Sequence, residues 1–175
     1  MSKKKISELE AAGIFVVSMV RGVQDTWPSI VSELASLLGE DVQRMDTEQV
    51  KFDFVLAVIA VQMQALSNLF PADQAARIRE HVLKCISSPD LGTYPIDSLK
   101  EYEHAWKASL DAREPPWGSL ASILYDKIGC NKSVSVGDAK VKSPILLVGL
   151  GSAIVRLGRA WWKDFISAYE LVPNI

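Results

Sequence analysis

The stretch FDFVLAVIAVQMQALSNLF, residues 52–70, decides the fold of this chain. Its apolar side chains recur on nearly every side of a helical wheel, which is the pattern of a helix buried in the middle of a bundle. Asp46 offers an N-terminal cap, so we expect a helix over 47–69. The stretch approaches the length of a membrane span, but Asp53 and Gln62 are among five polar residues that interrupt it. We therefore predict a buried core helix and no membrane span.

A second apolar stretch, PILLVGLGSAIVRLG at 144–158, lies near the C-terminal end. Arg156 is its single charged residue, and the stretch is shorter than the roughly 20 apolar residues that cross a bilayer. Pro144 fits the first turn of a helix, which we expect to run to about Tyr169 with its glycines as weak points. This helix is the second that we expect at the centre of the bundle.

Other helical segments are marked by caps, prolines and glycines. They predict helices over 7–24, 26–39, 71–87, 98–113 and 115–127, with Ser7 and Ser98 as N-caps. The alternation in SVSVGDAKVK, residues 133–142, fits a short β-hairpin or a plain loop. The sequence thus predicts an all-α fold, a single-domain bundle over residues 1–175 with about six to seven helices around two central apolar ones.

Composition narrows the function classes. Hydrophobic residues make up 49% of the 175 residues and the net charge is −2, which excludes a disordered chain and argues against nucleic acid as a partner. The two cysteines, Cys85 and Cys130, have no ligand-like spacing, and we expect free thiols in the cytoplasm. Phosphate-binding, dinucleotide-binding and hydrolase motifs are absent from the sequence. We predict no catalytic residue, no metal site and no cofactor, and lean against an enzyme.

Few side chains in the sequence are candidates for a catalytic, metal-binding or ligand-binding role. His81 and Cys85 are spaced i, i+4 on one expected helix, where a histidine can lower the pKa of a thiol or supply half of a zinc site. A buried structural cysteine beside a boundary histidine is the alternative. Asp53 would be a carboxylate in the most apolar helix, placed to complement the helix dipole or to pair with Arg156. The residues that we expect at a ligand site, if one exists, are Asp53, Gln64, His81, Cys85 and Arg156.

Small and aromatic residues suggest a contact surface. Gly149 and Ala153 belong to a stripe of small residues that allows close helix packing, either within the chain or in a dimer. Trp161 and Trp162 are adjacent on a helix and cannot both face one core, so one should lie at a boundary or interface. Our leading hypothesis is a non-enzymatic interaction module that forms a homodimer. A carrier of a small apolar or amphipathic ligand is the alternative, and a thiol- or metal-dependent enzyme is the third.

Overall fold

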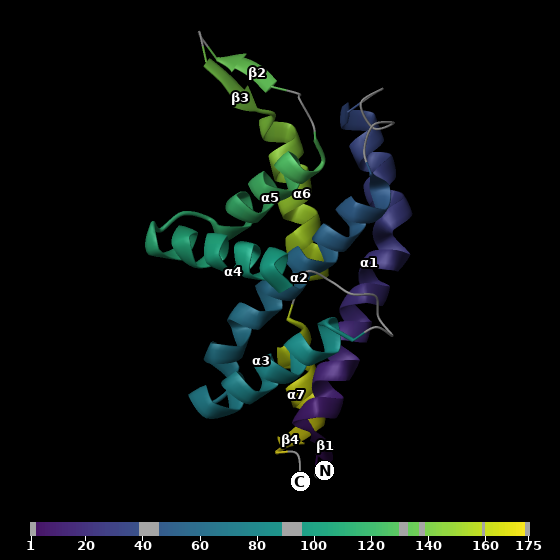
Figure 1. Ribbon diagram of the computed structural model, residues 1–175, viewed down its shortest axis with the longest axis vertical. Helices are drawn as coiled ribbons and strands as arrows, with labels where there is room; N and C mark the ends of the chain where they lie inside the picture. The colour runs from purple at the N-terminus through teal and green to yellow at the C-terminus, as the bar shows by residue number, and fades with distance from the viewer. Residues whose placement is uncertain are drawn as a thin grey trace.

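The computed structural model describes residues 3–38, 46–88, 96–129, 133–136, 139–158 and 160–173. It is an all-α bundle with short strands added at two places, as predicted (Figure 1). The helices are α1 (Glu8–Leu38), α2 (Thr47–Leu69), α3 (Ala72–Ile86), α4 (Ile96–Asp111), α5 (Pro116–Lys127), α6 (Pro144–Leu157) and α7 (Trp161–Ala168). The strands are β1 (Lys4–Ser7), β2 (Ser133–Val136), β3 (Ala139–Lys142) and β4 (Tyr169–Val172).

Helix α2 is the centre of the bundle. It contacts α1, α3, α4, α5, α6 and α7, and the run from Asp53 to Ala60 is buried without interruption. Asp46 caps it through a 3.1 Å hydrogen bond that the backbone N–H of Gln49 donates to the Asp46 side chain. The all-round apolar pattern and the cap therefore predicted this helix with its observed bounds.

Helix α1 corrects one expectation, because a single helix of 31 residues replaces the two that we predicted around Thr26 and Pro28. Ser7 does cap it, accepting a hydrogen bond from the backbone N–H of Glu10 at 3.1 Å. Pro28 lies inside the helix with its ring exposed, while Trp27 and Ile30 beside it are buried. The buried stripe runs on in register across the proline, so packing outweighs the hydrogen bond that proline removes.

The C-terminal segment also differs from the single long helix that we expected. Helix α6 ends at Leu157 with Gly158 as its C-cap, and Ala160, with a φ of 55°, is the N-cap of a separate helix α7. Helix α6 is not wholly central: Leu146, Leu150 and Ile154 are buried, but its opposite face is exposed. Only α2 therefore has the all-round burial that its sequence predicted.

Three other elements match the sequence closely and one is shifted. Helices α3 and α5 lie within a residue of their expected starts and ends, and β2 pairs antiparallel with β3 as a hairpin. Helix α4 begins at Ile96, so Ser98 lies inside its first turn and is not its cap. The side chain of Ser98 instead accepts a long hydrogen bond from the Lys127 ammonium, at 3.5 Å.

The two ends of the chain meet in a parallel strand pair that we did not predict. Strand β1 pairs with β4, with Ile6 opposite Leu171 in the register (Figure 1). Ile6 is buried against the core, and the ammonium of Lys3 donates a hydrogen bond to the carbonyl of Ile166 at 2.5 Å. Two four-residue strands so far apart in sequence have no local signal, because their pairing depends on where α1 and α7 bring them.

Two segments within the described residues pass a length and hydropathy test for a membrane span. They are Thr47–Leu69, with 67% of its apolar window buried in the protein, and Pro144–Ala168, with 41% buried. A core helix passes the same test, and the burial of α2 fits that explanation. The second segment leaves more of its apolar surface uncovered, and that surface belongs to α6.

Candidate functional site

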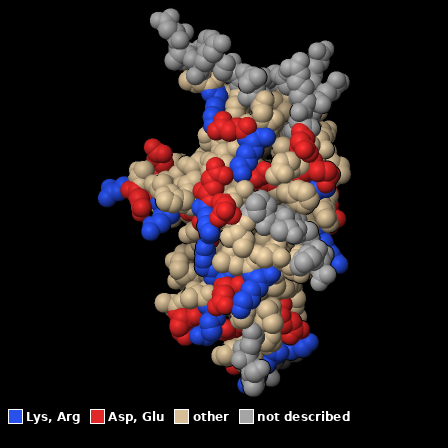
Figure 2. Space-filling model, in the orientation of Figure 1, with Lys and Arg blue, Asp and Glu red and all other residues tan. Residues whose placement is uncertain are grey.

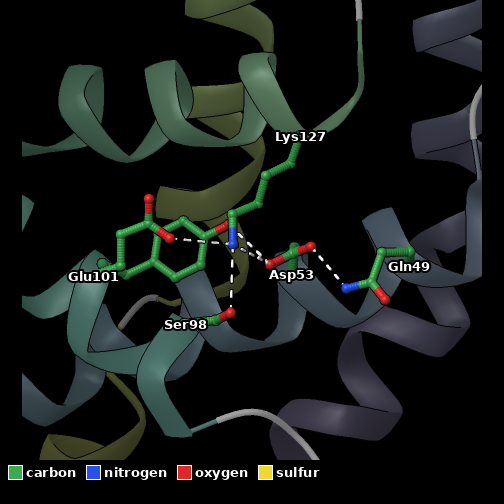
Figure 3. Close-up of polar contacts among 6 residues, drawn as sticks. Gln49, Asp53, Ser98, Glu101 and Lys127 are labelled. Carbon is green, nitrogen blue, oxygen red and sulfur yellow. Dashed lines mark hydrogen bonds and ion pairs between the residues drawn. The ribbon is translucent and has the colours of Figure 1, made fainter.

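A buried polar cluster joins α2, α4 and α5 (Figure 3). Asp53 is 2% exposed, and its Oδ1 lies 2.8 Å from the Nζ of Lys127, the last residue of α5. Gln49, one turn earlier on α2, donates from Nε2 to the other carboxylate oxygen at 3.0 Å. The hydroxyl of Tyr102 on α4 donates to Oδ1 at 3.4 Å. The carboxylate therefore has an ion pair and two hydrogen bonds, as a buried charge requires.

Tyr102 and Lys127 in this cluster are held in their protonated forms. Burial, followed by the charges of Asp53 and Glu101, raises the pKa of the Tyr102 phenol far above neutrality. Burial by itself would lower the pKa of Lys127, but the hydrogen bonds and charges of Asp53 and Glu101 together outweigh it, so that pKa is raised. Glu101 adds a second ion pair to Lys127 at 3.2 Å. The ion pairs and hydrogen bonds of this cluster join α2, α4 and α5.

The thiol of Cys85 and the imidazole of His81 lie one turn apart on α3. Cys85 is partly buried against the core, and burial raises the pKa of its thiol, which keeps it protonated. His81, one turn earlier, lies close enough to Glu8 and Glu80 to contribute to the lowered pKa of both carboxyl groups. Among the described residues, no three His, Cys, Asp or Glu side chains converge as a metal site. Cys130 lies outside the described residues.

A groove of about 580 Å³ runs between α2, α4 and the α6–α7 junction. We call it the α2–α4 groove; its lining includes Gln62, Gln64, Asn68, Trp106, Leu110 and Lys163. Gln64, one of the ligand candidates, lies here. Gln62 was not among those candidates, although it is 2% exposed and its Oε1 has no hydrogen-bond partner among the described residues. Its position on an apolar helix was the one sequence signal that could have singled it out.

A second groove, of about 660 Å³, lies on the exposed side of α6. We call it the α6 groove; it is lined by Trp117, Val148, Gly151, Ser152, Val155 and Arg156. Arg156 is exposed here and makes no ion pair among the described residues, so it does not pair with Asp53 as we had considered. The ring of Trp117 on α5 covers Gly151 so closely that a Cβ there would lie 2.4 Å from its Cε3.

The predicted contact residues separate into two groups. Trp162 is fully buried, in an aromatic cluster with Phe15 at 4.8 Å and Phe70 at 5.9 Å between ring centroids. Trp161 is only partly buried and stacks on Phe165 at 4.6 Å, so it is the tryptophan at the boundary. Trp162 has no surface to offer a partner.

The small residues of α6 face the chain's own N-terminal helix. Gly149 and Ala153 line a narrow crevice of about 20 Å³ with Ile30 and Leu34 of α1. Their small size thus brings α6 close to α1 within one chain. The sequence pattern marked a close helix approach but could not distinguish a partner within the chain from one outside it.

The candidate ligand residues do not converge. Asp53 lies in the polar cluster, His81 and Cys85 lie on α3, and Gln64 and Arg156 line two different grooves. On the face seen in Figure 2, Lys and Arg alternate with Asp and Glu along a band, without a large area of one sign. The two grooves are therefore the surfaces on which a function can be argued.

Comparisons with known proteins give no relative for this chain. No model of a known protein family matches it, and searches of curated proteins and of solved structures find no significant match.

Proposed function

We propose that this protein is a helical interaction module that forms a homodimer through the exposed face of α6. One observation carries the proposal: Ile145, Val148 and Val155 are 68%, 54% and 43% exposed, all on one side of the same helix. Trp117 on α5, 36% exposed, extends this apolar surface beside them. Exposed apolar surface that is contiguous is a feature of interaction sites, whereas single exposed apolar residues are ordinary.

The composition of α6 favours a second copy of the chain as the partner. Arg156 is the single charged residue between Pro144 and Leu157, so the helix offers almost no charge that a different partner would have to match. In an antiparallel pair of α6 helices, the two Arg156 side chains would lie at opposite ends and would not repel each other. Ser152 at the middle of the exposed side has little bulk, which permits close approach.

The expected interface is larger than α6 itself. A 14-residue helix is about 21 Å long, and stable dimers bury about 800 Å² on each subunit. Trp117 and the neighbouring surface of α5 therefore belong to the proposed contact. Tryptophan near the middle of an interface commonly contributes much of the binding free energy.

Sedimentation velocity over the micromolar range tests the proposal. We expect a dimer for the wild type, a monomer with an unchanged circular dichroism spectrum for Val148→Asp, and a dimer for the control Ile14→Asp. Ile14 is 40% exposed on α1, so its substitution adds the same charge to a different surface. A wild type that stays monomeric, or a Val148→Asp variant that stays dimeric, would contradict the homodimer. Binding of the monomer to anionic phospholipid vesicles through Val148 would assign the same face to a membrane surface.

The expected cytoplasmic location stays a prediction, since it depends only on the cysteine content. A non-enzymatic role also stays a prediction. The protonated thiol of Cys85 supports it, because the thiolate is the nucleophilic form of cysteine.

A further inference from the structure

We propose that the α2–α4 groove is a binding site for a small amphipathic molecule with an apolar body, a hydrogen-bond donor and an anionic group. The site is separate from the α6 face, and it does not depend on whether the protein dimerises. Each of the three ligand features corresponds to a part of the groove.

Gln62 is the reason that we expect a hydrogen-bond donor on the ligand. Its side chain is 2% exposed and belongs to the groove wall, yet its Oε1 has no partner among the described residues. A buried acceptor without a donor costs free energy, and native proteins retain few of them. A bound N–H or O–H group would satisfy it.

The apolar body has a matching wall. Val61 and Ala65 from α2 lie opposite Trp106 and Leu110 from α4. Leu110 is 53% exposed, although it is an apolar side chain beside a groove. Few convergent polar groups in an otherwise apolar concave surface are typical of small-molecule sites. The groove volume of about 580 Å³ is within the range of such sites.

Lys163 is the reason that we expect an anionic group on the ligand. It lies on α7 at the edge of the groove, is exposed, and forms no ion pair among the described residues. Gln64 and Asn68 on the same edge add amide groups that can donate to an anion. A ligand that reaches from Gln62 to this edge would use both its neutral donor and its charge.

A fluorescent probe with these three features is 8-anilino-1-naphthalenesulfonate, which has aromatic rings, one N–H and one sulfonate. We expect one molecule to bind per chain, with an affinity that falls about 3- to 10-fold in Gln62→Leu, the range expected for one lost hydrogen bond. Lys163→Gln should weaken binding further and reduce its salt dependence. Gln24→Leu, on the exposed side of α1, is the matched control and should bind as the wild type does.

Thermal unfolding separates this role from a structural one. Trp162 on α7 also has a buried donor, Nε1, without a partner among the described residues, and α7 contacts α2. If Gln62 served Trp162 in solution, Gln62→Leu would lower the Tm; if Gln62 is kept for a ligand, the variant should have an equal or higher Tm while it binds the probe less well.

Three results with the wild type and the Gln62→Leu variant would overturn the proposal. They are a wild type that does not bind the probe, a Gln62→Leu variant with unchanged affinity, and a Gln62→Leu variant with a lowered Tm. Loss of probe binding in Val148→Asp would also overturn it, because the probe would then be bound to the α6 face. Failure of the homodimer in sedimentation would leave this site unaffected.

Discussion

The Nζ of Lys127 lies 2.8 Å from the Oδ1 of Asp53, joining the last residue of α5 to the second turn of the central helix. The two residues are 74 positions apart in sequence. The Asp53 carboxylate is buried, whereas the Lys127 side chain is about a quarter exposed and also forms an ion pair with Glu101. The two partners are therefore unequally buried. Removing one of them should change the free energy of unfolding by a different amount than removing the other.

Lys127→Met should lower the free energy of unfolding by about 3 kcal/mol, because it leaves the buried Asp53 carboxylate without its counter-charge. Asp53→Asn should cost less, about 1–2 kcal/mol, since Lys127 can still pair with Glu101 and water. Urea unfolding of both variants measures the difference. An Asp53→Asn variant that is less stable than Lys127→Met would contradict this description of the pair.

Acid should weaken the attachment of α3 to the N-terminal end of α1. The side chain of Glu8 is fully buried, and Arg77 donates to it from Nε at 2.9 Å and from Nη2 at 3.0 Å. The hydrogen bonds and charge of Arg77 hold the pKa of Glu8 below its ordinary value of 4.5. A lowered carboxyl pKa contributes stability that is complete above about pH 4.5 and is lost as the pH falls through the folded value.

Glu8→Gln should therefore be less stable than the wild type at pH 7, by about 1.5–3 kcal/mol, with the two converging as the pH falls below 4. Glu33→Gln, on the exposed side of α1, is the control and should follow the wild-type profile. Chemical unfolding at a series of pH values gives the curves. A constant difference between Glu8→Gln and the wild type across this range would show that the ionisation of Glu8 is not the cause.

Alanine at two helical glycines should have opposite effects. At Gly13 on α1 a Cβ meets no atom within 4 Å, so Gly13→Ala should add about 1 kcal/mol of stability through helix propensity. At Gly151 the Cβ would lie 2.4 Å from the Trp117 ring, so Gly151→Ala should lower stability by about 1 kcal/mol despite the same propensity gain. Thermal unfolding compares the two. Equal stabilisation by both would mean that Trp117 does not rest on Gly151 in solution.

The thiol of Cys85 should react slowly in the folded protein. Its pKa is raised by burial, so in a Cys130→Ser background it should react with a disulfide reagent more slowly than in the urea-unfolded chain. The difference in rate should be largest above the ordinary thiol pKa of 9.0, where the exposed thiol is ionised and the buried one is still protonated. A folded-state rate above the unfolded-state rate would revive the thiol-enzyme hypothesis.

Several features could be predicted because their signals are local. The apolar run at 52–70 with Asp46 before it predicted α2, and the serine–valine alternation at 133–136 with the segment after it indicated the hairpin. The same reasoning failed at Pro28, where a local break signal was overridden by burial of the residues beside it. It also failed at Gly158, whose weakness in a helix was recognised while the new start of α7 was not.

The sequence by itself determined the fold class, the central helix and the surplus of apolar residues near the C-terminal end, because periodicity and caps act over a few neighbouring residues. Tertiary structure alone decided that Lys127 and not Arg156 pairs with Asp53, and that Ile6 lies opposite Leu171. It also decided which apolar residues of α6 stay exposed and that Gln62 lines a groove. Those relationships join segments far apart in the chain, and their geometry follows from how whole helices pack against one another.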